Sequence, residues 1–246
     1  MAAPDFPAIR LFADAPLAAG QDVALGPDAT NYLVNVLRLK SGDAVLVFNG
    51  RDGEWRARLR SVGKKAAVLA VEAATRTQTP AGDLWYLFAP LKHARLDYVV
   101  QKAVEMGASV LQPVLTRHTQ VSRINLDRMR ANVVEAAEQC GVLAVPKARA
   151  ETTLPALLAD WPATRTLIFC DEDAELADPV ATLGRLRNRS LAVLIGPEGG
   201  FAVEEREQLL AVPGIVRLSL GPRILRAETA AIAGLTLWQA NLGDWA

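Results

Sequence analysis

The sequence is poor in cysteine and histidine, with two of each among 246 residues. Cys140 and Cys170 form no CxxC pair, and His93 and His118 stand alone, so no zinc-ligand spacing can be drawn. Two distant cysteines also provide no disulfide framework. We therefore expect no metal site, and we expect both cysteines to be packing residues.

Long apolar runs and a leader sequence are also missing. No stretch approaches the roughly 20 apolar residues of a membrane span, and the opening MAAPDFPAIRLF lacks the basic and apolar regions of a signal peptide. By contrast, 51% of the residues are hydrophobic, enough to bury a sizeable core. The sequence predicts a globular, cytoplasmic protein with no membrane partner.

The chain carries no net charge, which taken alone argues against a nucleic-acid partner. The charges are unevenly distributed, however. Lys and Arg outnumber Asp and Glu up to Ala150, and acidic residues outnumber basic ones from Glu151 onward. Such an asymmetry can conceal a nucleic-acid-binding face, but it can equally be scatter.

Residues 1–75 show the pattern of a small, mostly β domain. Apolar and polar residues alternate in short segments bounded by Asn-Gly, Asp-Gly and Gly-Lys turns, which is typical of a β-meander. The expected strands cover residues 44–48, 55–62 and 66–74. A helix capped by Asp28 is expected ahead of them. Its apolar face would consist of Tyr32, Leu33, Val36 and Leu37.

A linker rich in Thr, Pro and Gly, TRTQTPAGD (Thr75 to Asp83), separates this domain from a second one, residues 76–246. Strands and helices alternate beyond the linker, and strands as apolar as LAVLI are typical of a parallel α/β sheet covered on both faces. The expected strands are 84–89, 110–114, 166–170, 191–195 and 215–220. The expected helices are 96–106, 126–140, 204–210 and 227–241.

Two of these strands end in Gly-Pro turns. LAVLIGPEGGF spans Leu191 to Phe201, and VRLSLGPRILRAETA spans Val216 to Ala230. Ligands of open α/β sheets bind beyond the carboxyl ends of the strands, and the glycines of GPEGG would let a ligand approach the backbone closely. The alternative is that these glycines serve tight turns only. Neither G-x-G-x-x-G nor G-x-x-x-x-G-K-[ST] occurs, which disfavours a dinucleotide site or an NTPase.

Together, LIGPEGGF and LGPRILRAETA resemble the signature of the SPOUT methyltransferases, and within them of the RsmE family. The blocks NYLVNVLRLKSGD, KHARLDYVVQKAVEMGASVLQPV and NVVEAAEQCG resemble RsmE blocks in the same order, so the similarity spans nearly the whole chain. The chain departs from the common family residue at Asn31, His93 and Val142, none of which lies in the two signature loops.

The resemblance implies a PUA-like β-barrel for RNA binding, followed by a SPOUT-type α/β domain with a deep C-terminal trefoil knot, and a homodimer. It implies S-adenosyl-L-methionine as methyl donor and N3 of a uridine in 16S ribosomal RNA of the small subunit as acceptor, with uracil 1498 as the family target. The alternatives are another RNA substrate for the same enzyme class, or a ribosomal-RNA-binding protein without turnover. The small residues of 227–235 make that helix a candidate dimer contact, although an ordinary buried helix would look the same.

The resemblance places the cofactor against both signature loops, with the loop after Cys170 as a third wall. The expected cofactor-binding residues are Ile195, Gly196, Pro197, Glu198, Gly199, Gly200, Leu218, Leu220, Gly221, Ile224, Leu225 and Arg226. Methylating uracil N3 requires no covalent nucleophile, but negative charge develops on the ring as its proton leaves.

Arginine suits the task of stabilising that charge, so Arg226 is the first catalytic candidate and Arg10 the second. A structural ion pair for Arg226 and a phosphate contact for Arg10 are the alternatives. Glu198 would orient substrate or cofactor, or cap the helix that follows. His118, in a basic stretch, is interpreted as an RNA-binding or surface residue.

Basic residues for RNA gather in the first domain, where Arg56, Arg58 and Arg60 alternate with apolar residues and would share one face of a strand. A solvated β face would look much the same. The expected RNA-binding residues are Arg10, Arg38, Arg51, Arg56, Arg58, Arg60, Lys64, Lys65 and Arg117.

Overall fold

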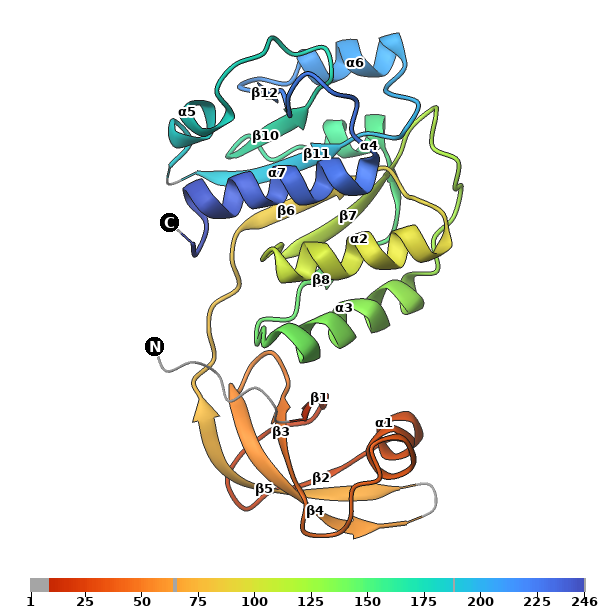
Figure 1. Ribbon diagram of the computed structural model, residues 1–246, viewed down its shortest axis with the longest axis vertical. Helices are drawn as coiled ribbons and strands as arrows, with labels where there is room; N and C mark the ends of the chain where they lie inside the picture. The colour runs from red at the N-terminus through yellow and green to blue at the C-terminus, as the bar shows by residue number, and fades with distance from the viewer. Residues whose placement is uncertain (1–8, 64–65, 188, 246) are drawn as a thin grey trace. The chain divides into compact units, whose positions relative to one another are not determined.

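The computed structural model describes residues 9–63, 66–187 and 189–245 (Figure 1). The chain divides into two compact units. The first comprises Met1–Pro80 and Ala137–Val145, and the second comprises Ala81–Ala136 and Pro146–Ala246. The division at Pro80 lies inside the expected linker. The segment Ala137–Val145 comes from the middle of the chain, and sequence continuity had assigned it to the second domain.

The first unit contains a five-stranded sheet in the order β1, β3, β4, β5, β2. Its strands are β1 Arg10–Phe12, β2 Asp22–Ala24, β3 Ala44–Phe48, β4 Glu54–Val62 and β5 Ala67–Arg76. Neighbours are antiparallel except β1 and β3, which are parallel. Alternate residues such as Val45, Val47, Leu59 and Leu69 are buried in a common core. The predicted meander is present, while β1 and β2 are too short for alternation to reveal them.

The helix of the first unit differs from the expectation. α1 (Pro27–Asn31) begins after Gly26, not after Asp28, and continues into a π-helix, η1 (Tyr32–Val36). The Leu37 N–H donates to the Tyr32 carbonyl, an i to i−5 bond that winds the chain more widely than an α-helix. As a result only Leu33 of the predicted apolar face is fully buried, whereas the side chains of Tyr32 and Val36 are largely exposed.

A parallel sheet forms the second unit, in the order β12, β10, β11, β6, β7, β8, with β9 paired to β7. The strands are β6 Leu84–Phe88, β7 Val110–Leu115, β8 Lys147–Ala148, β9 Thr152–Thr153, β10 Arg165–Cys170, β11 Ser190–Ile195 and β12 Val216–Leu218. The parallel α/β architecture is thus confirmed. β8 and β9, two residues each, were not predicted.

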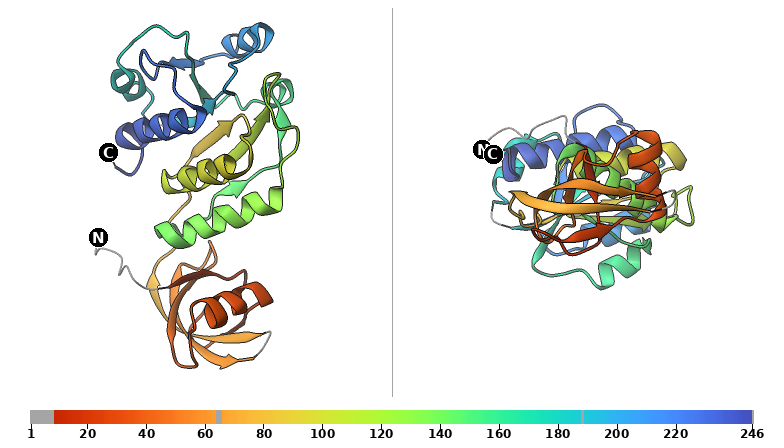
Figure 2. Two further views of the ribbon diagram at one scale, coloured as in Figure 1. Left: turned by 45° about the vertical axis from the view of Figure 1, so that its right-hand side comes forward. Right: turned by 90° about the horizontal axis from the view of Figure 1, so that it is seen from below.

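The helices are α2 His93–Glu105, α3 Leu126–Cys140, α4 Leu154–Ala159, α5 Pro179–Gly184, α6 Val203–Leu210 and α7 Ala227–Leu242. α4 and α5, six residues each, were not predicted. α2 and α5 both contact α7, and Figures 1 and 2 show α2 beside α7.

The sheet of the second unit is covered on both faces. A Cβ placed at Gly234 of α7 would lie 3.6 Å from Val193 and 3.4 Å from Cys170 Sγ, so α7 approaches the sheet closely. On the other face α4 and α6 pack with Ala192 and Leu194. Burial raises the pKa of the Cys170 thiol to about 12, so this cysteine acts as a packing residue and not as a nucleophile.

Candidate active site

Three loops leave one edge of the parallel sheet together. Cys170, the last residue of β10, is paired with both Ile195 of β11 and Leu218 of β12. Because these strands are parallel, the loops that follow them begin at the same edge. The GPEGG loop (196–200) and the RILR loop (223–226) therefore lie beside the loop after Cys170, which is the arrangement expected of a cofactor site. That they bind a cofactor stays a prediction.

The GPEGG loop (196–200) packs closely against its neighbours. A Cβ at Gly196 would come within 2.5 Å of the Phe201 ring, which itself packs edge-on against Phe169. Gly200 has a φ of +69°, and a Cβ there would come within 2.8 Å of Glu172 Oε1. At these two positions a larger side chain would displace either the ring or the carboxylate.

His118 and Arg117, which follow β7, form hydrogen bonds to the GPEGG loop and to the start of α6. His118 Nδ1 donates to the carbonyl oxygens of Gly199 and Gly200 at 3.1 and 3.0 Å. The Arg117 backbone N–H donates to Glu205 Oε1 at 2.8 Å. The hydrogen bonds of His118 give it a place in the site that sequence reasoning missed, because the basic residues around it suggested an RNA contact instead.

An ion-pair cluster joins the GPEGG loop to the first turns of α2 and α7. Arg95 Nη2 donates to Glu198 Oε1 at 2.6 Å and also to Glu228 Oε2. These bonds hold the pKa of both carboxyl groups below the usual range and raise the pKa of Arg95. The N-cap of α6 is Ala202, so Glu198 does not cap that helix. Arg95 and Glu228 were absent from the predicted site, although both lie in blocks that carried the resemblance.

Arg226 stands at the N-cap of α7 with an exposed side chain. Within the described chain its guanidinium makes no hydrogen bond or ion pair, although its positive charge helps to lower the pKa of Glu198 and Glu228. Its five N–H donors are therefore available to a substrate. This arrangement is compatible with the predicted catalytic role. The alternative, a structural ion pair, is not present among the described residues.

The apolar residues expected to bind the cofactor differ in how far they are exposed to solvent. Ile195 and Leu218 are buried in the sheet, so that only their backbone groups can face a ligand. Leu220 and Leu225 are partly exposed, and Ile224 is 97% exposed. The sequence motif did not distinguish these cases, because exposure depends on which way the loop turns.

Asp171 anchors the loop after β10. Its carboxylate is 2% exposed and accepts hydrogen bonds from Arg206 Nη2 at 2.8 Å and from Arg217 Nε at 2.6 Å. The Asp173 N–H donates to the same carboxylate. Two arginines thus neutralise one buried carboxylate and fix the start of the loop, leaving the carboxylates of Glu172 and Asp173 exposed.

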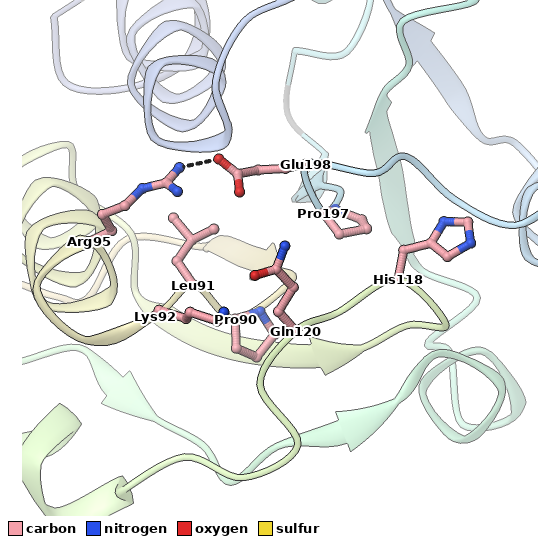
Figure 3. Close-up of a pocket in the computed structure, with 8 residues that line it drawn as sticks. All are labelled: Pro90, Leu91, Lys92, Arg95, His118, Gln120, Pro197 and Glu198. Atoms are coloured by element: carbon pink, nitrogen blue, oxygen red, sulfur yellow. Dashed lines mark hydrogen bonds and ion pairs between the residues drawn. The ribbon is translucent and has the colours of Figure 1, made fainter.

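A small pocket, partly open to solvent, lies beside the GPEGG loop (Figure 3). Three segments contribute to it: the turn into α2, the segment after β7, and the GPEGG loop itself. Its lining residues are Pro90, Leu91, Lys92, Arg95, His118, Gln120, Pro197 and Glu198. Its lining joins the buried Pro90 and Leu91 to a few more exposed polar groups.

The predicted RNA-binding arginines of β4 lie on one exposed face of the first unit's sheet. Arg56, Arg58 and Arg60 alternate with buried Ala57 and Leu59. Their partners are acidic and themselves at least partly exposed: Glu72 accepts from the first two arginines, and Asp22 from the third. Exposed pairs of this kind are weak, so phosphate groups can compete for these arginines.

Arg10 has a different environment from the one expected. Its side chain is 7% exposed, and its Nε donates to Glu54 Oε2 at 2.8 Å. Its Nη1 donates to the carbonyls of Ala137 and Glu138, and the guanidinium lies 4.5 Å from the centre of the Phe48 ring. With its nitrogens so engaged, Arg10 has the surroundings of a structural residue, and we leave it out of the catalytic and RNA-binding sets below.

The remaining predicted RNA contacts are exposed or undescribed. Arg51 is exposed and paired with Asp14, Arg117 is exposed, and Arg38 is exposed with a φ of +58°, which is unusual for a residue other than glycine. Lys64 and Lys65 lie outside the described residues.

In the described part of the chain, no helix is long and apolar enough to cross a bilayer. Across the same residues, no group of three or more His, Cys, Asp or Glu is placed to hold a metal ion.

Comparison with known proteins gives consistent matches. An RNA methyltransferase domain matches residues 77–239, and an RNA methyltransferase PUA domain matches residues 25–72. Ribosomal RNA small subunit methyltransferase E from Synechocystis is 31% identical, covering 89% of this chain and 73% of that protein. Its namesake from Rickettsia conorii is 29% identical, covering 92% and 93%. The crystal structure of the Neisseria gonorrhoeae enzyme of this name, bound to S-adenosyl methionine, aligns with a TM-score of 0.87 at 27% identity, covering 97% and 100%.

Proposed function

The chain belongs to the RNA methyltransferase family that includes ribosomal RNA small subunit methyltransferase E, and we propose that it methylates N3 of a uridine in 16S ribosomal RNA, the family target being uracil 1498. We propose S-adenosylmethionine as the methyl donor. The observation that supports this most directly is the meeting of the GPEGG and RILR loops at one sheet edge, with Arg95 joining Glu198 to the start of α7.

The residues at this edge fit such a cofactor. Leu220 and Leu225 offer partly exposed apolar surface for an adenine, and the exposed carboxylates of Glu172 and Asp173 can accept from ribose hydroxyls or an ammonium group. At Gly221, whose φ is +102°, no atom lies within 4 Å of where a Cβ would be, so its backbone is open to a ligand. When bound, the cofactor supplies an electrophilic methyl group on a sulfonium sulfur.

The chemistry at uracil requires two bonds to form, N3 to the methyl carbon and the proton to its acceptor, and two to break. The N3 lone pair forms the new bond to the methyl carbon as the carbon–sulfur bond breaks, and the N3–H proton passes to a base or to water. Negative charge spreads onto O2 and O4 of the ring as that proton leaves. Arg226, exposed and unpaired among the described side chains, can donate to one of these oxygens through its guanidinium.

The RNA would be held by the first unit. Its β4 arginines offer phosphate contacts on an exposed β face, and the matched PUA domain supports an RNA-binding role. We also retain as proposals the family's trefoil knot, its homodimer and a cytoplasmic location, where small ribosomal subunits are present.

The experiment that tests this function is methyl transfer from labelled S-adenosylmethionine to small ribosomal subunits from a strain lacking this activity. Nucleoside mass analysis and mapping of the modified position would follow. We expect N3-methyluridine at one site. Cofactor binding without transfer would redirect the search to another RNA, and the lack of both would favour an RNA-binding protein without turnover.

A further inference from the structure

The last third of the chain is acidic, yet one short segment of it carries several positive charges. Residues 151–246 contain eight arginines and no lysine. Three of these arginines pair with the carboxylates of Asp83 and Asp171, and two belong to the RILR loop. The other three lie in the connection between α5 and β11 (Figure 1). They are called the arginine segment below and are Arg185, Arg187 and Arg189.

The side chains of the arginine segment are exposed and unpaired. None of the three makes a hydrogen bond or an ion pair within the described residues. The backbone beside them is anchored, because Leu186 is 7% exposed and its N–H donates to the Leu183 carbonyl at 2.8 Å. The start of the segment is therefore fixed to the second unit, while its guanidinium groups remain in solvent.

Two carboxylates near the ends of this connection bind other groups. Asp83 accepts from the hydroxyl of Ser190, the first residue of β11, at 2.5 Å and also pairs with Arg165. Asp178 caps the far end of α5, where it accepts from a backbone N–H at 2.9 Å. Arg185 is the C-cap of α5, a position at which positive charge complements the helix dipole. The other two arginines of the segment have no such structural role.

The arginine segment lies at the opposite end of β11 from the GPEGG loop. The segment precedes Ser190, and the loop follows Ile195. A strand of six residues spans about 17–20 Å. A group bound by the arginine segment would therefore be well separated from the atoms that react at the GPEGG and RILR loops.

We propose that Arg187 and Arg189 bind backbone phosphates of the ribosomal RNA, in a part of the RNA distant from the target nucleotide. This inference rests on the function proposed above, which makes a polyanion the partner of this chain. Guanidinium groups match phosphate oxygens with paired N–H donors, and here no carboxylate competes for them among the described residues. The contact is separate from the β4 arginines, which belong to the first unit. It contributes to affinity for the RNA and not to the chemical step.

One test does not depend on methyl transfer. The affinity of the full chain for protein-free 16S ribosomal RNA is measured over a range of KCl concentrations. In Arg187→Gln/Arg189→Gln the slope of log affinity against log salt should be shallower by about 1.5, because each lost phosphate contact accounts for about 0.7–0.9. Arg128→Gln/Arg130→Gln is the matched control, since it removes two exposed arginines that already pair with carboxylates. Equal slopes in the two double variants would overturn the proposal.

The second test uses turnover on small ribosomal subunits. Arg187→Gln/Arg189→Gln should raise KM for the subunits about 10-fold and leave kcat unchanged, because it removes binding that is equal in the ground state and the transition state. Tm and cofactor affinity should also be unchanged, since both side chains are exposed and unpaired among the described residues. A fall in kcat at saturating subunits with unchanged KM would contradict the proposal, because the segment would then act on the chemical step.

The outcomes separate this proposal from the function on which it rests. A shallower salt slope in the double variant of a protein that transfers no methyl group would contradict the proposed reaction and leave the RNA contact supported. Methyl transfer with unchanged KM and an unchanged salt slope would retain the reaction and refute the contact. A raised KM on subunits with unchanged binding to protein-free RNA would overturn the proposal in favour of an acidic surface of a ribosomal protein.

Discussion

Replacing Arg95 by glutamine removes the charge that joins three segments of the proposed active site. Arg95 Nη2 contacts Glu198 of the GPEGG loop and Glu228 at the start of α7. Glutamine retains a polar side chain of moderate length, so the change removes the ion pairs with little loss of packing. Without the arginine, the two carboxylates would face each other as like charges. In the intact cluster the pairing with Arg95 outweighs this repulsion, so the pKa of Glu198 stays below its usual range.

The expected loss of stability depends on how far the paired side chains are exposed to solvent. The side chains of Arg95, Glu198 and Glu228 are 34%, 37% and 20% exposed. Fully exposed ion pairs contribute about 0.2–1 kcal/mol, and hydrogen bonds to charged groups about 1.5–3 kcal/mol when solvent is excluded. For this partly exposed cluster we expect a loss of about 1–2 kcal/mol, which lowers Tm by about 4 °C in a protein of this size.

Turnover should fall further than the loss of stability alone would cause. Glu198 belongs to the loop assigned to the cofactor, and Glu228 follows Arg226 closely, so loosening the cluster displaces both the methyl donor and the catalytic candidate. Misplacement of this kind costs about 10–100-fold in kcat. Arg128→Gln is the matched control, because the exposed Arg128 pairs with Asp97 and forms no ion pair with Glu198 or Glu228 in the described structure.

The pH dependence provides a separate check. Since the pairing with Arg95 depresses the pKa of Glu198 and Glu228 in the folded protein, its stabilisation is fully present above the ordinary value of 4.5. It is lost as the pH falls through the depressed values. The Tm difference between the unmodified protein and Arg95→Gln should therefore be largest near neutral pH and shrink below about pH 4.5. Equal Tm and equal turnover in Arg95→Gln and the unmodified protein would refute this account.

Three further predictions follow from the environments of the arginines. Arg226→Ala should reduce kcat about 100-fold with unchanged Tm, because the side chain is exposed and unpaired among the described residues; full turnover under saturating substrates would remove it from the mechanism. Arg10→Ala should destabilise the protein by about 1.5–3 kcal/mol in denaturant titrations, since the buried Glu54 loses one of its two arginine partners and keeps Arg76; a loss below about 1 kcal/mol would contradict the structural role. Replacing the three β4 arginines by glutamine should weaken RNA binding and flatten its dependence on salt, and an unchanged salt slope would exclude that face.

The long elements were predictable from sequence because their patterns are local. The helix Leu126–Cys140 was predicted with the observed bounds, and β3 was as well, because apolar periodicity and flanking glycines lie within the segment itself. The helix near Tyr32 was predicted incorrectly in its buried face. A π turn changes the spacing of side chains, and nothing in the local pattern of apolar residues specifies it.

The site was predictable only in part. The two Gly-Pro turns identified where a ligand would bind, since parallel strands end at a common edge. The partner of Glu198 was not predictable, because Arg95 is 103 residues away in the chain. Likewise, an arginine near the N-terminus looks the same in sequence whether it contacts phosphate or lies buried against Glu54, as Arg10 does.

The sequence by itself determined the class of sheet, the location of the loops and the membership of a family, because these depend on periodicity, glycine positions and motif order. Only the tertiary structure decided which side chains meet. It placed Arg95 between Glu198 and Glu228, bonded His118 to the GPEGG loop and left Gln120 without a partner among the described residues. The physical reason is that hydrogen bonds and ion pairs act over a few ångströms, and sequence separation does not indicate which distant groups the fold brings within that range.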